Sequence, residues 1–214
     1  MKLKLVTGLF LMAAVGNAYS ETLMSNGQPI SVNLSNKGTA SISNCAEYVA
    51  LRKEGGTVND YPGLSDPDFR EAQDALKNCY LDAYANENGL KEVTPSLTTL
   101  SVANVVEHFP AQAALAISDE EVAKLKKNFI GKTIIDTAPD LKSDGGRMIS
   151  TKTDSGYMVW NRRAFEDSAG KMYSFITLSS FPLSGTYASL RTYQILSEQE
   201  KVWTIKEVTE NSPL

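Results

Sequence analysis

The hydrophobic pattern of this chain changes period near Gly131, and this change constrains the fold more than any other feature. Before Gly131, apolar residues recur every three to four positions, which is typical of helices. After Gly131 they alternate with polar residues, which is typical of strands that bury one face. Because helices come first and strands second, the pattern predicts an α+β fold, with N-terminal helices followed by a C-terminal antiparallel meander sheet.

Local signals set the expected bounds of the helices. Asp66 is predicted to be an N-cap, with Pro67 as the first helical residue and Gly89 in the left-handed position that ends the helix. Ser118 and Glu121 have the spacing of a capping box. The expected helices span residues 44–55, 66–89, 100–109 and 118–131.

The remaining segments complete a provisional division of the chain. Residues 1–20 are predicted to be a signal peptide and residues 21–40 an extended or flexible arm with at most one short edge strand. A helical region at 41–131 and an antiparallel β region at 132–214 follow, as two domains or as one. The expected strands span roughly residues 132–137, 147–153, 157–165, 171–180, 187–196 and 201–208.

The start of the sequence has the three parts of a bacterial secretory signal. Lys2 and Lys4 precede an apolar run from Leu5 to Gly16, and small residues at Ala18 and Ser20 favour cleavage after Ser20. An uncleaved anchor is the alternative, but a run of about a dozen residues is short for the roughly 30 Å of a bilayer core. We therefore expect a soluble, exported chain of about 194 residues, either periplasmic or secreted.

Cys45 and Cys79 are the only cysteines and lie on the apolar faces of two expected helices. In an oxidising compartment such a pair predicts a disulfide, here one that staples a helical hairpin. Two free buried thiols are the alternative reading, and the absence of a C-x-x-C motif argues against a redox enzyme. A disulfide that closes the loop between Cys45 and Cys79 would stabilise the fold by about 3–4 kcal/mol.

Charge and motifs exclude several functions. Removal of the predicted signal peptide takes away Lys2 and Lys4 and leaves 19 basic and 25 acidic residues. The resulting formal charge of −6 argues against nucleic-acid binding. One His and two Cys make a transition-metal site improbable, and no nucleotide-binding motif occurs, so no cofactor is expected. The stretch Asp140 to Gly145 echoes a calcium loop, but Lys142 and Thr151 occupy ligand positions, so a polar turn is the simpler interpretation.

The strands after Gly131 carry aromatic residues at alternating positions. If the sheet leaves one face partly open, these residues would line a groove for a ligand; if helices cover them, they are simply the core. Neighbouring cations at Arg147, Lys152, Arg162 and Arg191 would favour an anionic group, unless they lie on a solvated strand face. The residues predicted to bind a ligand are Tyr157, Trp160, Arg163, Tyr173 and Tyr193.

Because no catalytic motif is present, the sequence favours a non-catalytic binding or adaptor protein. Its partner would be a small apolar or anionic ligand or an envelope protein, and the oligomeric state is left open. The alternative is a cell-envelope hydrolase that uses residues such as His108, Asp140 or Asp144. Helices leading into a meander that ends at Val202 to Ile205 resemble cone-shaped α+β ligand-binding folds in architecture, a likeness that transfers no site residues.

Overall fold

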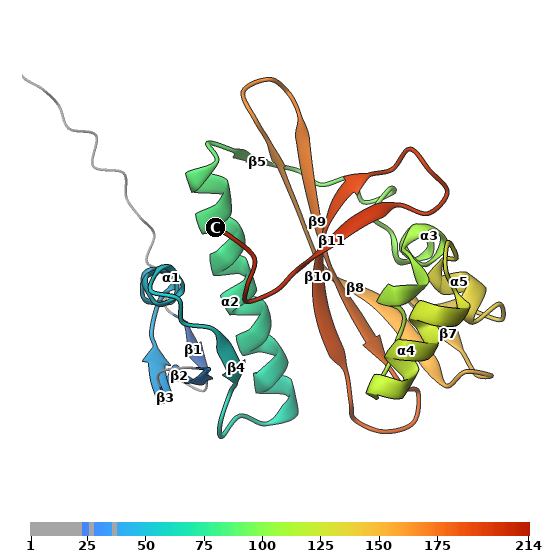
Figure 1. Ribbon diagram of the computed structural model, residues 1–214, viewed down its shortest axis with the longest axis horizontal. Helices are drawn as coiled ribbons and strands as arrows, with labels where there is room; N and C mark the ends of the chain where they lie inside the picture. Colours follow the sequence, from blue (N-terminus) through green and yellow to red (C-terminus); the bar gives the residue numbers. More distant parts are fainter. Residues whose placement is uncertain (1–22, 26–27, 36–37) are drawn as a thin grey trace, which may run out of the picture.

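Two sheets organise the part of the chain that the structure describes, residues 23–25, 28–35 and 38–214 of a computed structural model. The predicted signal peptide, residues 1–20, lies outside these residues. Figure 1 shows α2 on one face of the larger sheet and α3, α4 and α5 on the opposite face, with α1 and the smaller sheet beyond α2. None of the described helices is both long and apolar enough to cross a membrane.

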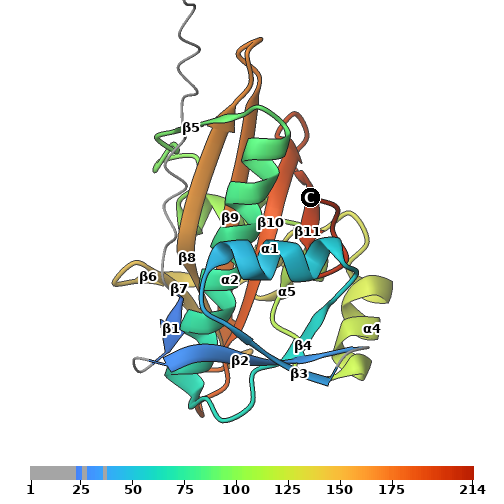
Figure 2. The same ribbon diagram turned by 90° about the vertical axis from the view of Figure 1, so that its left-hand side faces the viewer.

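The N-terminal layer consists of the smaller sheet and two helices. Its elements are β1 (Met24–Ser25), β2 (Gln28–Leu34), β3 (Gly38–Ile42), α1 (Cys45–Lys53), β4 (Val58–Asp60) and α2 (Asp66–Glu87). β2 pairs antiparallel with β3 along one edge and with β1 and β4 along the other. Figure 2 shows this layer in front, with α1 crossing α2.

The larger sheet follows the order β11-β10-β9-β8-β7-β6, with β5 paired to the far end of β8, and all its pairs are antiparallel. The sequence-based prediction of helices followed by an antiparallel meander is therefore confirmed. The strands are β5 (Lys91–Val93), β6 (Lys142–Asp144), β7 (Arg147–Ser150), β8 (Ser155–Glu166), β9 (Met172–Phe181), β10 (Ser189–Ser197) and β11 (Thr204–Val208). The helices on its outer face are α3 (Val102–His108), the 3₁₀ turn η1 (Ala111–Ala113), α4 (Asp119–Asn128) and α5 (Ile134–Thr137).

The long helix α2 follows its sequence signals closely. The N-cap is Ser65, one residue before the predicted Asp66, and Pro67 lies in the first turn. Gly89 adopts the expected left-handed φ of 64° just after the helix. The N–H of Leu90 then donates to the carbonyl of Ala85 at 2.9 Å, which satisfies a carbonyl of the last turn as in a Schellman motif.

The predicted disulfide is present and joins α1 to α2 through Cys45 and Cys79, which are 34 positions apart. Tyr48 and Leu76, with 0% and 1% of their surface exposed, belong to the core beside it. This core also includes Phe175 and Val208 from the larger sheet, so the N-terminal layer and the sheet share buried surface.

A second core fills the opposite face of the larger sheet. Val105, Val106 and Phe109 pack there against Tyr193 and other sheet residues. Phe109 makes an edge-to-face contact with Tyr193, their ring centroids lying 5.5 Å apart. The larger sheet is thus covered on both faces, by a different set of helices on each.

Two segments differ from the sequence-based expectation. Within residues 21–40, expected to form an arm, the structure has β1, β2 and the start of β3, and alternating Ile30, Val32 and Leu34 are buried in the first core. Residues 132–137, predicted as a strand, contain α5 instead. The N–H of Thr133 donates to the carboxylate of Asp136 at 2.8 Å, and this local cap favours a helical turn over an extended chain.

Candidate functional site

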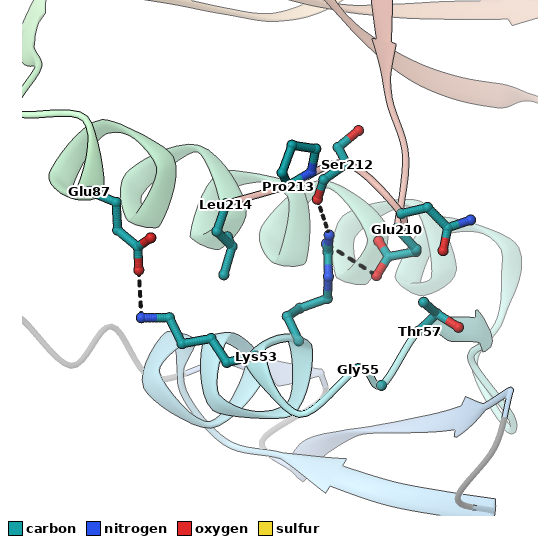
Figure 3. Close-up of a pocket in the computed structure, with 11 residues that line it drawn as sticks. Lys53, Gly55, Thr57, Glu87, Glu210, Ser212, Pro213 and Leu214 are labelled. Carbon is teal, nitrogen blue, oxygen red and sulfur yellow. Dashed lines mark hydrogen bonds and ion pairs between the residues drawn. The ribbon is translucent and has the colours of Figure 1, made fainter.

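Two of the cavities on the described surface differ in chemistry. The first lies where the end of α1 meets the C-terminal segment 209–214, and has a volume of about 370 Å³. Figure 3 shows Lys53 reaching Glu87 across one side of this cavity and Glu210 lying on the other. Its walls are mainly polar side chains and backbone, with Pro213 and Leu214 as the apolar exceptions.

The polar groups on one wall of this first cavity bind one another. The carboxylate of Glu210 accepts a hydrogen bond from the Tyr48 hydroxyl at 3.1 Å and forms ion pairs with Lys77 at 3.4 Å and Arg52 at 3.5 Å. Arg52 also donates to the carbonyl of Ser212 at 2.7 Å. These contacts fasten the chain beyond β11 onto α1 and α2, so this wall is primarily a structural contact.

Burial changes the ionisation of this network. Desolvation lowers the pKa of Lys77, because a buried ammonium loses its hydration, while the nearby Glu210 carboxylate opposes this effect. Desolvation is also the main cause of the raised pKa of Tyr48, and Glu210 adds to it. Lys77 is 14% exposed and Arg52 5%, so the cations depend on Glu210 for compensation.

The second cavity lies between α4 and the rim of the larger sheet and has a volume of about 400 Å³. We call it the α4 pocket and define it by its apolar wall and its hydroxyl floor. Leu115, Ile117, Leu125 and Pro182 provide the apolar wall. The floor carries the hydroxyl groups of Thr137, Thr153, Ser155 and Tyr157. A volume of this size with mixed walls is typical of small-molecule sites.

Tyr157 fixes the floor of the α4 pocket. It is 1% exposed, and its hydroxyl accepts a hydrogen bond from the N–H of Leu115 at 3.1 Å. Burial raises the pKa of Tyr157, and the N–H of Leu115 together with the hydroxyls of Ser155 and Thr137 opposes this rise only in part. The phenol therefore stays protonated at neutral pH.

The helix that covers the pocket, α4, has well-formed capping contacts at its start, and its side chain Leu125 packs against the second core. None of the residues of α4 is buried. The hydroxyl of Ser118 accepts from the N–H of Glu121 at 3.2 Å, as the capping box predicts, but the Glu121 carboxylate accepts from Ile117 at 2.7 Å, one residue before the expected position. Ile117 is 62% exposed at the rim. A helix with few buried contacts is a region that opens at low free-energy cost.

The structure separates the five residues predicted to bind a ligand. Tyr157 lies in the floor of the α4 pocket, whereas Tyr193 is 3% exposed inside the second core. The other three, Trp160, Arg163 and Tyr173, lie toward the α2 side of the sheet. Trp160 is 38% exposed at a bulge in β8 and lies beside Asp74. Tyr173 packs against the first core. These positions do not form a single groove.

The arginines expected at the rim of a groove already have partners. Arg163 binds Asp82 and Glu92, each at 2.7 Å. Arg191 pairs with Glu207 at 2.7 Å, Arg162 donates to the carbonyl of Leu100 at 2.7 Å, and Arg147 pairs with Asp144.

The residues considered for hydrolysis occupy three separate environments. The ring of His108 stacks on Trp203 with centroids 4.9 Å apart, and its Nδ1 lies 2.8 Å from the carbonyl of Lys201. Asp140 accepts a hydrogen bond from Ser150, and Asp144 pairs with Arg147. Among the described residues, no group of three or more His, Cys, Asp and Glu side chains is arranged to hold a metal ion.

Sequence reasoning did not find the α4 pocket, although it named one of its residues. The missing elements are the wall residues Leu115 and Leu125 and the hydroxyls of Thr137 and Ser155. One signal was present, because Ile117 is an apolar residue just before a charged helix, but nothing in the sequence shows that α4 faces the turn between β7 and β8.

Comparison with known protein families, with curated protein sequences and with solved structures finds no match for this chain.

Proposed function

We propose that this protein is an exported, non-catalytic binding protein that holds a small amphipathic molecule in the α4 pocket. The observation that carries the proposal is the combination of an apolar wall, a hydroxyl floor and a covering helix that buries none of its own residues. Apolar walls supply affinity through buried area, and a few fixed polar groups orient the ligand.

The pocket is supported from below by a rigid element. Its floor residues Ser155 and Tyr157 belong to β8, which pairs with β9 over most of its length. The wall residue Leu125 belongs to α4, which has few packing contacts. A rigid floor with a loosely packed cover allows a ligand to enter without disturbing the sheet.

Native mass spectrometry of the protein recovered from its own compartment tests the proposal directly. We expect an added mass that is lost in Leu125→Trp, because the indole fills the pocket. The matched control is Val122→Trp, which places the same ring on the same helix at a position 37% exposed. Retention of the added mass in Leu125→Trp would place the ligand elsewhere.

If no mass is retained, 1-octanol serves as a probe in a ¹⁵N NMR titration. We expect it to shift the amide signals of Leu115 and Ser155 more than those of the first core, and to do so less in Leu125→Trp. Failure to perturb these amides in the folded protein contradicts the proposed pocket function.

The proposal includes export into an oxidising compartment, periplasmic or extracellular. The basic and apolar segments within residues 1–20 and the Cys45–Cys79 disulfide support it. Expression of the full chain in a bacterial host should yield a protein beginning at Glu21 with a mass two hydrogens below the reduced value. An uncleaved or fully reduced chain would contradict this part.

A further inference from the structure

A series of hydrogen-bonded hydroxyl groups, which we call the hydroxyl chain, joins the floor of the α4 pocket to a carboxylate outside it. From this arrangement we infer that the pocket selects a ligand whose polar end donates hydrogen bonds. The ligand class is a primary ammonium group on a short apolar tail. This inference rests on the proposed function and names the class of ligand for the same pocket. It depends on which oxygen in the chain holds each proton.

The hydroxyl chain begins at Asp140, which follows α5 in the sequence. The hydroxyl of Ser150 lies 2.6 Å from one carboxylate oxygen of Asp140, and the N–H of Lys152 donates to the other at 3.2 Å. These bonds hold the pKa of Asp140 below its ordinary value of 3.8, the Ser150 contact having the largest effect. At neutral pH the carboxylate can only accept, so the proton of Ser150 must point to Asp140.

The same reasoning fixes the next two protons. Because Ser150 has used its one proton, the hydroxyl of Thr153, 2.8 Å away, must donate to it. Thr153 has then used its proton, and its remaining contact, 2.8 Å to the hydroxyl of Ser155, requires Ser155 to donate. Every proton in the chain therefore points away from the pocket and toward Asp140.

The floor is left with more acceptors than donors. Thr137 uses its own proton on the carbonyl of Ile134 at 2.7 Å. The hydroxyls of Ser155 and Thr137 are close enough to the phenol of Tyr157 to affect its pKa, and each has already donated its own proton elsewhere, while the phenol has a single proton to give. One of the two oxygens keeps a free lone pair, so the floor attracts a hydrogen-bond donor and disfavours a carboxylate.

Charges around the pocket act in the same direction. The lining contains two carboxylates, Glu121 and Asp154, and one cation, Lys124, which leaves a net charge of −1. The ammonium of Lys124 lies 2.9 Å from Glu120, and the Lys124 side chain is 62% exposed. This negative charge attracts an ammonium ligand and repels an anionic one.

Three six-carbon probes with the same apolar part test the inference: hexylamine, 1-hexanol and hexanoate. We expect hexylamine to bind about tenfold more tightly than hexanoate, in line with the net value of a hydrogen bond to a charged group. Chemical-shift titrations that follow the amides of Leu115, Thr153 and Ser155 report both the affinity and the position of binding.

Asp140→Asn tests the role of the chain, because an amide can also donate and so allows the protons to reverse. We expect this variant to reduce the preference for hexylamine over hexanoate to about threefold or less, the loss of part of one charged hydrogen bond. Thr153→Val, at an exposed position, interrupts the chain at its middle and should have the same effect. The control Asp144→Asn removes the same charge from a surface pair with Arg147 and should leave the preference unchanged.

The possible outcomes separate the two proposals. Preferential binding of hexanoate at the pocket amides overturns the inferred ligand class and leaves the pocket function standing. A preference for hexylamine that survives both Asp140→Asn and Thr153→Val overturns the role of the hydroxyl chain. If none of the three probes perturbs the pocket amides, the proposed function fails, and the inference with it.

Discussion

The two faces of the larger sheet are covered in opposite ways. On one face, the 22-residue helix α2 is joined to α1 by a disulfide and to the C-terminal segment through the Lys77–Glu210 pair. On the other face, short helices cover an apolar core, and α4 contributes no buried residue. The α2 face is fastened by covalent and ionic contacts, whereas the α4 face contains the pocket with an apolar wall and a hydroxyl floor.

This difference indicates that the α2 face is the rigid part of the molecule and that the α4 face is the part that can admit a ligand. A small domain gains stability from cross-links and paired charges where nothing needs to move. A binding pocket needs a cover that can open without unfolding the sheet, and α4 is suited to this because its terminal caps satisfy backbone groups locally. The variants below test whether the two faces are independent in this way.

Loss of the disulfide should give the largest effect. The double variant Cys45→Ser/Cys79→Ser is expected to lower the free energy of unfolding by about 3–4 kcal/mol, because its unfolded chain regains the entropy of a closed loop. Urea denaturation measures the loss. Hydrogen exchange should accelerate in α1 and α2 before it does in α3. Equal acceleration on both faces would show that they unfold as one unit.

Matched leucine truncations compare the two helices directly. Leu76→Ala in α2, at a position 1% exposed, should cost about 3 kcal/mol through lost burial and a cavity. Leu125→Ala in α4, at a half-buried position, should cost less than about 1 kcal/mol because little surface is lost. Thermal and urea unfolding of both variants provide the comparison, and similar costs would contradict the description of α4 as a loosely packed cover.

The ionic contact of the C-terminal segment should have an intermediate effect. Glu210→Gln removes the charge that compensates Lys77 and Arg52, and we expect a loss of about 1–3 kcal/mol. The control Glu87→Gln removes the same charge from an exposed pair with Lys53 in the same cavity and should change stability by about 0.5 kcal/mol or less. Equal changes in the urea midpoint would mean that Glu210 is no more important than a surface charge.

The pH dependence of stability should differ in sign between the two faces. Hydrogen bonds lower the pKa of Asp136 and Asp140 beside α5, so their stabilising contribution is present above pH 3.8 and is lost as the pH falls below it. Burial raises the pKa of Asp74 in α2, so protonation just above pH 3.8 favours the folded state there.

Urea midpoints measured from pH 6 to pH 2.5 test these directions. Asp140→Asn should make the urea midpoint fall less steeply as the pH drops below 3.8. Asp74→Asn should remove the rise in the urea midpoint that we expect as the pH falls toward 3.8 from above. An Asp74→Asn profile parallel to that of the unmodified protein would show that burial of this carboxylate has no effect on stability.

Much of the fold could be predicted because its signals are local. The bounds of α2 follow from Pro67 and Gly89, and the strands β8, β9 and β10 follow from alternation between turn-forming residues. The errors have a local origin as well. Ile134 and Ile135 resemble part of a strand, but the contact between Thr133 and Asp136 favours a helical turn.

The candidate site was less predictable because it depends on contacts between distant segments. Tyr157 was named for its place in an alternating strand, which also fits Tyr193, a core residue. Only the packing of α4 against the turn before β8 distinguishes the two. The partners of Arg163, on α2 and β5, likewise lie 81 and 71 positions away in sequence.

The sequence by itself determined the order of helices and strands, the pairing of Cys45 with Cys79 and the excess of acidic residues, because periodicity, cysteine number and charge are properties of the chain. Tertiary structure alone decided which face of the sheet each helix covers and which hydroxyls meet beneath α4. The physical reason is that a pocket is the space left between elements, and its chemistry depends on how those elements pack together.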